Sequence, residues 1–565
     1  MNSLSLAAVS CGALYLGYLF YGRVIARLWD FQPDRPTPAT ESPDRVDYVA
    51  ARHWTVLFGH HFASIAGVGP VVGPLLACAV WGWLPTVIWV VIGSVFLGAV
   101  HDFSSLMASL RARGHSIAEI AESHLGHRVR VIFGAFLWLA LVLVVGVFAH
   151  FGAQTLAGTP QVVIPTLGVI GAALIVGVLM YQRGMSQAPA TVIGLTLLAA
   201  CIYLGYRYPV ELPWGEKNVL AWTLILLGYA YVASITPVNL LLQPRDYLST
   251  FVLYAGMIAG YAGLVLTRPD IQAPPMRSFA SSSQGPLWPM LFVIVACGAI
   301  SGFHSLIASG TTAKQLGREA DAPRIGYGAM IVEGALAILA VVAVIGGLRW
   351  GTGEGTYTTL LGSEGPLRTF AVGFSVLTEP IFRDPALGAL VALTMLKTFV
   401  MTTLDSATRI TRYIGDELFA DGLGLEFLRN RFLSTALIIA GALYLSLGSW
   451  QTIWPVFGSA NQLIAALALL VLTVVLWRRG KAVIYTLLPF AFMMATTVGA
   501  LIYQGWGFLG DRKIGLATIS VALIVLSLMM LVDSARVVVR ERRARSSAPG
   551  EEAAAAVTGV GSGRE

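Results

Sequence analysis

The sequence predicts an all-α membrane protein that crosses the bilayer many times. Of its 565 residues, 56% are hydrophobic and only 12% are charged, whereas a soluble protein carries about 25% charged residues. Apolar runs of about 20 residues, the length that crosses a bilayer as a helix, recur along almost the whole chain. These runs are continuous and do not alternate over about 10 residues, which excludes a transmembrane β-barrel.

We expect about 15–16 transmembrane helices, some of them discontinuous. The predicted spans lie near residues 3–25, 57–80, 84–110, 129–152, 162–180, 188–206, 218–242, 248–267, 287–308, 326–349, 386–408, 432–449, 452–477, 483–504 and 514–536. A further apolar stretch at 366–380 is either a re-entrant segment or an additional span. The N-terminal residues lack the basic region and the small-residue cleavage site of a signal peptide, so we interpret them as the first span.

Basic residues are distributed unevenly between alternate loops. With the N-terminus outside, 27 of the 37 Lys and Arg residues, Arg245 among them, fall in the inner loops and the C-terminal tail, as the positive-inside rule requires of a cytoplasmic face. The formal net charge of +7 therefore follows from topology and indicates no nucleic-acid partner. Residues 541–565 are of low complexity, and we expect a disordered cytoplasmic tail there.

The span at 57–80 contains helix-weakening residues, and we predict that it is broken. These residues are Gly59, Gly67, Gly69, Pro70, Gly73 and Pro74. Broken helices occur in a bilayer only where protein or a water-filled cavity surrounds them, and in transporters the freed backbone groups bind substrates and ions. The alternative is a glycine-rich face for close packing, but that needs neither His60 nor His61. Ser64 adds a hydroxyl to this candidate site.

A second segment, 301–316, repeats part of this pattern. The spacing Gly302-x-His304-x5-Gly310 matches Gly59-x-His61-x5-Gly67. Chance similarity accounts for so short a match equally well, but paired interrupted spans are typical of a midplane binding site. Hydroxyls and flexible backbone in this segment suit a carboxylate or a small cation. The candidate residues are Ser301, His304, Ser305, Ser309, Gly310, Thr311 and Thr312.

A third segment, 394–418, places Lys397, Thr402, Thr403 and Asp405 in an otherwise apolar helix. Charges inside a membrane are costly and indicate function by default. Lys397 and Asp405 are eight residues apart and lie on nearly the same helix face. Either they bridge through a partner helix, or Lys397 replaces a bound cation. A further interpretation places Asp405 at the inner interface, where it caps the region of two following arginines.

Three isolated polar residues complete the candidate set. Asp102 follows His101 deep in the third span, where it serves either a proton relay or a helix–helix hydrogen bond. Glu333 lies one or two turns inside the tenth span and is able to titrate there. Asn461 belongs to the run IWPVFGSANQLIAAL, whose proline, glycine and amides are predicted to break the start of a span.

Several motifs are absent from the sequence. There is no GxxxxGK[ST] phosphate-binding loop and no HExxH zinc motif. The adjacent His60 and His61 point about 100° apart on a helix, which makes them a poor metal pair. We therefore expect neither an ATPase nor an intramembrane metalloprotease, and no enzyme activity, metal or cofactor.

Six segments of the chain are similar to one family: HHFASIAGVGPVVGP, GAVHDFSSLMASLRARGHSIAEIA, ITPVNLLLQPRDYLSTF, SGFHSLIASGTTAKQL, MTTLDSATRITRYI and WPVFGSANQLIAALAL. In this order they resemble the carbon starvation protein A (CstA) family of bacterial inner-membrane transporters, from about residue 5 to residue 480. The resemblance implies proton-coupled uptake of peptides or pyruvate during carbon starvation, and a LeuT-like core with discontinuous helices. It also implies an N-terminal body at 1–330 and a five-span region at 331–480, followed by additional transmembrane helices at 481–540. The short tail departs from the longer members of the family.

The leading hypothesis is a secondary transporter that imports pyruvate or short peptides with protons. The broken spans form its site, with Gly310, Thr311 and Thr312 on the substrate carboxylate and Lys397 neutralising it. Histidine changes charge near neutral pH, which suits proton coupling. The proton-coupling candidates are His61, Asp102, His304, Glu333 and Asp405. A solute sensor without net accumulation is the alternative, and a channel is a third class.

Overall fold

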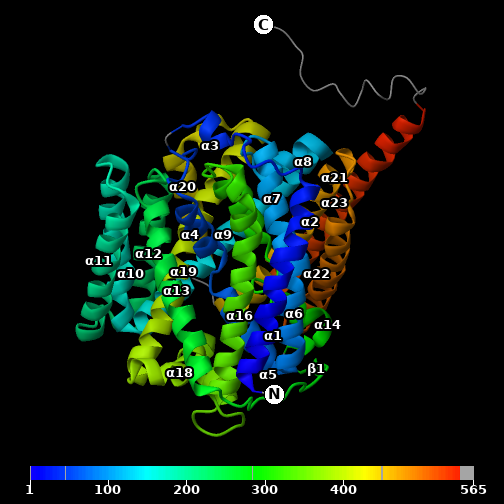
Figure 1. Ribbon diagram of the computed structural model, residues 1–565. Helices are drawn as coiled ribbons and strands as arrows, with labels where there is room; N and C mark the ends of the chain where they lie inside the picture. The colour runs from blue at the N-terminus through cyan, green and yellow to red at the C-terminus, as the bar shows by residue number, and fades with distance from the viewer. Residues whose placement is uncertain (1, 45, 283, 447–449, 548–565) are drawn as a thin grey trace.

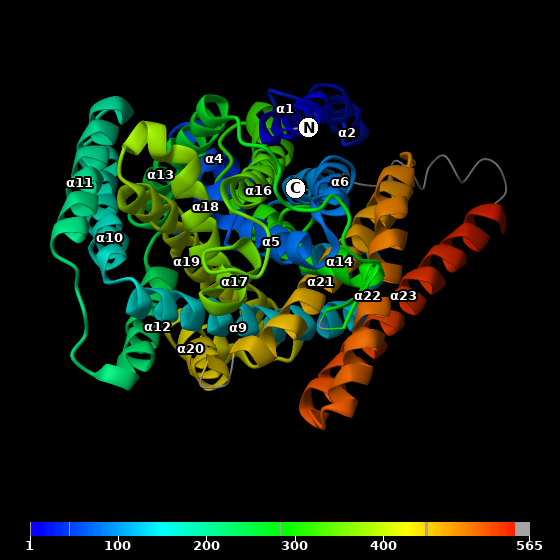
Figure 2. The ribbon, with the colours of Figure 1, turned by 90° about the horizontal axis from the view of Figure 1, so that it is seen from below.

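The computed structural model describes residues 2–44, 46–282, 284–446 and 450–547. Within them the chain forms a bundle of long helices, with the N-terminus at one end and the last helix projecting at the other (Figure 1). Seen along the bundle, the cyan helices α10 (Val163–Gly177) and α11 (Gln187–Arg207) lie at one edge. Helices α22 (Ile484–Gly510) and α23 (Ile514–Ser547) lie at the opposite edge (Figure 2).

The remaining helices of the first half are α1 (Ser3–Leu16), α2 (Gly22–Leu28), α3 (Pro38–Glu41), α4 (Trp54–Ile65), α5 (Gly69–Trp81), α6 (Trp83–Gly93), α7 (Ala99–Arg111), α8 (Ile117–Leu125), α9 (His127–Gly158), α12 (Asn218–Ile235) and α13 (Leu242–Thr267). Those of the second half are α14 (Leu287–Ile294), α15 (Gly302–Ile307), α16 (Gly328–Gly347), α17 (Tyr357–Ser363), α18 (Gly365–Phe382), α19 (Pro385–Gly415), α20 (Arg431–Ser446) and α21 (Trp450–Arg478).

Short π- and 3-10-helical segments extend or connect these helices. They are η1 (Gly17–Tyr21), η2 (Ser94–Gly98), η3 (Pro160–Val162), η4 (Val178–Gln182), η5 (Gly215–Lys217), η6 (Ala308–Thr312), η7 (Glu319–Asp321), η8 (Pro323–Tyr327), η9 (Asp416–Gly422) and η10 (Glu426–Arg429). One antiparallel hairpin, β1 (Ala280–Ser281) with β2 (Gly285–Pro286), pairs Ala280 with Pro286 near the N-terminal end of the bundle.

The all-α polytopic fold is confirmed, and fewer of the expected 15–16 helices, some of them predicted to be discontinuous, are long unbroken spans. Twelve helices among the described residues are long and apolar enough to cross a membrane, or up to 13 with one bent pair counted as a single span. The two counts differ because hydropathy identifies apolar segments but does not show where a helix is interrupted within them. The predicted span at 287–308 consists of two short helices, and α20 has only 16 residues. The stretch at 366–380 lies within α18.

The first predicted break is present. Helices α4 and α5 meet at residues 66–68 and are bent by 41° relative to each other. The second break lies earlier than expected, because residues 302–312 are helical in α15 and η6 while 295–301 are not. The third segment runs uninterrupted through α19, and α21 is also continuous, so the break predicted around Asn461 does not occur.

Two carbonyl groups of the second break accept hydrogen bonds from side chains of the preceding segments α6 and η2. Trp89 Nε1 donates a hydrogen bond to the Val295 carbonyl at 3.0 Å, and Ser94 Oγ donates one to the Gly298 carbonyl at 3.0 Å. Free carbonyl groups in a bilayer cost several kcal/mol each, so these two donors make the break tolerable.

Two glycines of α5 allow the two breaks to touch. A Cβ atom at Gly73 would clash with the Ile294 carbonyl oxygen, and one at Gly69 would clash with the side chain of Cys297. The glycine-rich segment is therefore both a broken helix and a close-packing face. Its glycines weaken the helix, and Gly69 and Gly73 also let α5 approach the second break.

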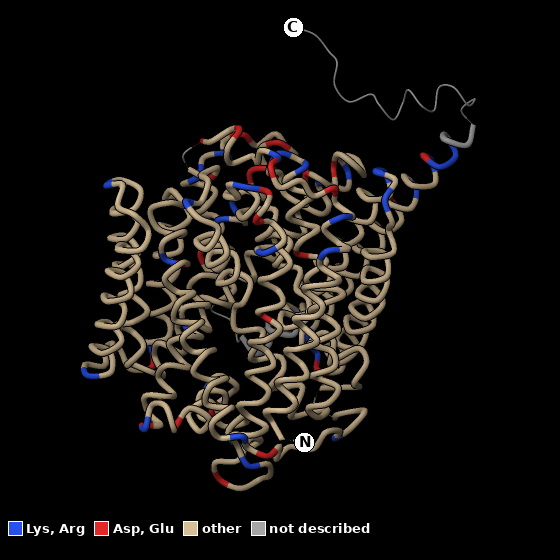
Figure 3. Tube along the Cα trace, viewed as in Figure 1, with Lys and Arg blue, Asp and Glu red and all other residues tan. Residues whose placement is uncertain are grey.

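Lys and Arg residues gather mainly at the end of the bundle that carries α3 and α8, opposite the N-terminus (Figure 3). Helix α23 continues to Ser547 and includes the first residues of the predicted disordered tail, whereas 548–565 lie outside the described residues.

The contact at Gly73 predicts a stability effect. Replacing Gly73 with Ala should destabilise the protein by about 1–3 kcal/mol, because a backbone oxygen cannot move aside as a side chain can. The apparent melting temperature of the detergent-purified protein measures this. Gly171→Ala in α10 is the matched control, since no atom lies within 4 Å of its Cβ position. Equal melting temperatures for the two variants would contradict the close contact.

Candidate functional site

The two broken segments are joined by two histidine–threonine contacts. His60 Nε2 lies 2.9 Å from Thr311 Oγ1, and His61 Nδ1 lies 2.8 Å from Thr312 Oγ1. All four side chains are buried. The threonines belong to the π-helical segment η6, a conformation that is frequent at functional sites. Adjacent residues of one segment thus contact adjacent residues of the other, and the two behave as one unit.

A buried ionic cluster lies on one side of this unit. Arg245 of α13 donates from Nε to Asp246 Oδ1 at 2.9 Å and forms an ion pair with Asp405 of α19. Tyr229 OH donates to Asp405 Oδ2 at 2.7 Å, and His60 Nδ1 lies 2.6 Å from Asp246 Oδ2. The four charged or imidazole side chains are fully buried. We call these five residues the Arg245 cluster.

The Arg245 cluster changes two expectations. Asp405 does not cap the following arginines, because its charge is neutralised by Arg245 inside the bundle. Charge counting had also placed Arg245 in an inner loop, whereas it lies in the first turn of α13, fully buried. The adjacent Arg245 and Asp246 in an apolar context were the available signal for this cluster.

A second buried cluster lies around His304 of α15. Asp102 accepts from both neighbouring imidazoles, with His101 Nδ1 at 2.8 Å from Oδ1 and His304 Nδ1 at 3.0 Å from Oδ2. His304 Nε2 lies 3.6 Å from Glu333 Oε2. The sequence singled out Asp102, His304 and Glu333 but gave His101 no role. We call these four residues the His304 cluster.

The His304 cluster has unused hydrogen-bonding capacity. Within the described residues, both carboxylate oxygens of Glu333 and the Nε2 atoms of His61, His101 and His304 have no hydrogen-bond partner. All of these side chains are fully buried. Buried polar groups are normally paired, and exceptions that gather at one place indicate a site able to gain or lose a proton.

Lys397 is buried but is not bridged to Asp405. Its Nζ donates to the Gly152 carbonyl of α9 at 2.9 Å, and the described part of the chain shows no carboxylate within ion-pair distance of it. The bridge through a partner helix is therefore absent in this conformation. The Thr402 hydroxyl donates to Thr398 O at 2.9 Å, a hydrogen bond within its own helix.

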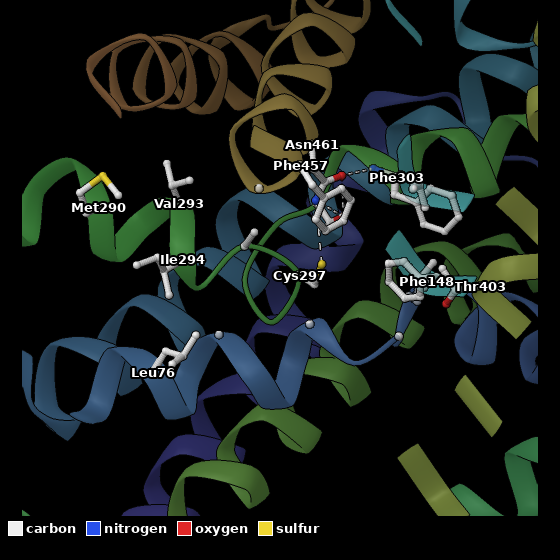
Figure 4. Close-up of a pocket in the computed structure, with 18 of the residues that line it drawn as sticks. Leu76, Phe148, Met290, Val293, Ile294, Cys297, Phe303, Thr403, Phe457 and Asn461 are labelled. Carbon is white, nitrogen blue, oxygen red and sulfur yellow. Dashed lines mark hydrogen bonds between the residues drawn. The ribbon is translucent and has the colours of Figure 1, made fainter. Parts of the chain in front are cut away.

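A cavity of about 260 Å³ lies between the two breaks. Figure 4 shows Asn461 and Phe457 of α21 beside the loop that contains Cys297, and Ile294 of α14 to one side. None of the side chains that line it in the described part of the chain is Asp, Glu, Lys, Arg or His. Among the residues predicted from the sequence, five line the cavity: Gly67, Gly69, Ser301, Thr403 and Asn461.

Asn461 organises one wall of this cavity. Its Nδ2 donates to Ser301 Oγ at 2.9 Å, and its Oδ1 accepts from the Phe303 backbone N–H at 2.9 Å. On the facing wall, Thr403 Oγ1 donates to the Ser64 carbonyl at 3.4 Å. Helix α21 is thereby connected to the start of α15, and α19 to the end of α4.

The other predicted hydroxyls of the second segment do not line the cavity. Ser305 donates to Gly302 O at 2.8 Å and Ser309 to Ser305 O at 2.7 Å, both within their own helical turns. Gly310 faces Ile410. In the first segment, the Gly59 carbonyl accepts from Thr250 Oγ1 at 3.0 Å.

An ionic contact holds the loop before α4 at the basic end of the bundle. Asp47 accepts from Arg409 Nη1 at 2.7 Å, from Arg412 Nη2 at 3.3 Å and from Tyr413 OH at 2.6 Å. Burial alone would raise the pKa of this carboxyl, but the two guanidinium groups and the phenol outweigh it and lower the pKa to about 2. Asp47, and not Asp405, is thus the partner of these arginines.

Fold and site together define a polytopic α-helical membrane protein with two discontinuous segments, buried charges and a neutral cavity. The chain belongs to the family described as carbon starvation protein CstA, which matches residues 2–348 and 352–500.

Three relatives illustrate the family. The peptide transporter CstA of Campylobacter jejuni is 32% identical, over 92% of this chain and 82% of that protein. The pyruvate/proton symporter BtsT of Escherichia coli is 33% identical, over 89% and 81%. The peptide transporter CstA of Bacillus subtilis is 31% identical, over 94% and 95%. At this level the prediction of a membrane transporter is confirmed, and the alternative of a sensor is not favoured.

The structure also matches a manganese transporter of Eremococcus coleocola over 88% of this chain and 99% of that chain. The TM-score is 0.38 and the identity 15%, values too low to support an argument. The LeuT-like core and the division at residues 330 and 480 stay predictions.

The Arg245 cluster predicts a large stability effect. Arg245→Met should destabilise the protein by about 3–5 kcal/mol, because it leaves a buried Asp405 and part of Asp246 uncompensated. Adding Asp405→Asn should restore part of the loss, since it removes the unpaired charge. Thermal unfolding of both variants in detergent tests this, and full stability of the single variant would show that Arg245 does not hold the cluster.

The lowered pKa of Asp47 predicts how its contribution depends on pH. Because the folded-state value of about 2 lies below the ordinary 3.8, the stabilisation is fully present above about pH 5 and is lost as pH falls through the folded-state pKa. Asp47→Asn should therefore cost about 2 kcal/mol, equally at pH 5 and pH 8. The exposed Asp511→Asn is the control. A cost that changes between pH 5 and pH 8 would contradict this assignment.

Proposed function

We propose that this chain is a secondary transporter that imports pyruvate or short peptides together with protons, in the response to carbon starvation. The relatives named above support transport of this kind. The single observation that carries the proposal is the contact of two broken segments, through His60–Thr311 and His61–Thr312, beside a neutral cavity. Transporters bind their substrates at discontinuous helices of this kind.

The proton is carried by the His304 cluster together with His61. Ionisable groups inside a membrane are costly and mark proton pathways, and imidazole changes charge near neutral pH. His61 belongs to α4, which packs against α15, and its Nε2 atom has no hydrogen-bond partner within the described residues. Asp405 is the weakest of the five candidates, because its ion pair with Arg245 opposes protonation.

The substrate enters the cavity between the breaks. The cavity is large enough for a pyruvate ion or a dipeptide, so its volume does not discriminate between these two substrates. In this conformation the Thr311 and Thr312 hydroxyls are hydrogen-bonded to His60 and His61, and Lys397 donates to the Gly152 carbonyl. Thr311, Thr312, Lys397 and Gly310 therefore contact the substrate carboxylate only in a second conformation. The residues that already line the cavity in this conformation are Gly67, Gly69, Ser301, Thr403 and Asn461.

The protein lies in a bacterial inner membrane with its N-terminus outside and its C-terminus in the cytoplasm. The concentration of basic residues at the end of the bundle opposite the N-terminus supports this orientation (Figure 3). The lipid bilayer is then the environment of the exposed apolar residues on the outer helices.

Uptake into proteoliposomes tests the proposed function. Labelled pyruvate and a labelled dipeptide are offered separately, with and without an inward proton gradient. Accumulation of one of them above equilibrium only with the gradient is expected. If neither accumulates although the protein is folded and present in both orientations, the proposal is wrong in its substrate or its coupling ion.

His61→Ala should abolish concentrative uptake, with at least a tenfold lower accumulation, while the protein remains folded. The reason is that His61 joins the broken segments and is itself one of the proposed proton-carrying groups. Uptake assays with size-exclusion profiles check this, and the exposed His127→Ala serves as the control. Normal accumulation by His61→Ala would remove His61 from the mechanism.

A further inference from the structure

Helix α15 and its N-cap residue contribute both to the cavity wall and to the His304 cluster. Ser301 and Phe303 line the cavity. The next residue, His304, is not among the residues that line the cavity and contacts Asp102 at 3.0 Å and Glu333 at 3.6 Å. A displacement of the first turn of α15 therefore changes the cavity wall and the distances within the cluster at the same time.

Asn461 controls the position of this first turn. It bonds Ser301 through its Nδ2 and the Phe303 backbone through its Oδ1, and it also lines the cavity. Gly302 lies against the same turn of α21, because a Cβ there would clash with the Asn461 carbonyl oxygen. The start of α15 is thus held by one side chain that is itself open to a bound solute.

The ionisable groups around His304 are few. From the elements packed against α15, α7 contributes His101 and Asp102, and α4 contributes His61; α16 adds Glu333. Segment η6 and residues 457–477 of α21 contain no Asp, Glu, Lys, Arg or His. On α19 the charged side chains are held by other partners: Lys397 by Gly152, Asp405 by Arg245, and both Arg409 and Arg412 by Asp47.

We propose that Asn461 couples occupancy of the cavity to protonation of the His304 cluster. This inference rests on the proposed function. A carboxylate or carbonyl oxygen of the substrate accepts the Nδ2 hydrogen that Asn461 now gives to Ser301. The amide turns, its Oδ1 leaves the Phe303 N–H, and the first turn of α15 moves. His304 then changes its distance to Asp102 and Glu333, which alters the affinity of the cluster for a proton.

Coupling free energies are reciprocal, so protonation must change substrate affinity by the same factor. Asn461 is a positioning residue in this scheme, since it acts on the proton through α15. Removing the Asn461 side chain should therefore uncouple substrate binding from protonation of the His304 cluster, in addition to any effect on the transport rate.

The test uses the full-length protein in proteoliposomes, with labelled pyruvate and a labelled dipeptide as probes. Two quantities are measured: the steady-state accumulation ratio under a proton gradient, and the dependence of KM on pH in substrate exchange without a gradient. Asn461→Ala is compared with Gln462→Ala, a buried amide on the same helix that donates to Phe292 O at 3.3 Å and does not line the cavity.

Asn461→Ala should reduce the accumulation ratio at least tenfold and make KM independent of pH, even where exchange is slower. Gln462→Ala should keep the accumulation ratio and pH profile of the unchanged protein. An Asn461→Ala protein with an unchanged ratio and pH profile would overturn the inference alone. Failure of the unchanged protein to accumulate either probe would overturn the proposed function and the inference with it.

A second variant covers the case in which Asn461→Ala does not fold. Asn461→Leu keeps a side chain of similar size, removes the Nδ2 donor and the Oδ1 acceptor, and adds no titratable group. It should show the same loss of pH dependence, and a pH-dependent KM equal to that of the unchanged protein would contradict the role of Asn461.

Discussion

The structure depends on one constraint: backbone that leaves the helical conformation inside a bilayer must find its partners within the protein. Here the Ala299 and Ile300 N–H groups donate to the Ala296 carbonyl within the second break, and side chains of the preceding segments supply donors for two further carbonyls. The glycines of α5 bring the first break against the second, the His60–Thr311 and His61–Thr312 contacts join the segments, and Trp89 and Ser94 satisfy freed carbonyls. The polar site is a consequence of this arrangement.

The buried charges divide into two groups with different physical behaviour. In the Arg245 cluster the guanidinium forms ion pairs with Asp405 and Asp246, and among the described atoms of the cluster only Asp405 Oδ1 is left without a hydrogen bond. In the His304 cluster, imidazoles and carboxylates face one another with unpaired polar atoms left over. A fixed ionic group stabilises one packing of the helices, whereas an incompletely paired one responds to a proton. The two groups meet at the adjacent His60 and His61.

The sequence predicted the architecture better than the pairing of side chains. Glycine, proline and histidine in 59–75 were sufficient to predict the bend between α4 and α5. The second break was placed too late, because residues 295–301 contain no proline and are mostly apolar, and only tertiary partners such as Trp89 explain it. Asn461 was expected to break its helix but instead supports another one. Arg245 was assigned to a loop, because sequence position does not reveal a buried counter-ion.

The measurement that tests this account most directly is the number of protons taken up when the purified protein binds its substrate. Titration calorimetry near pH 7, in buffers of different ionisation enthalpy, yields this number. The account predicts uptake of about one proton per substrate bound, because the two binding events are linked through α15, and predicts that His304→Ala abolishes it. Substrate binding with no proton uptake between pH 5.5 and pH 8 would contradict the account.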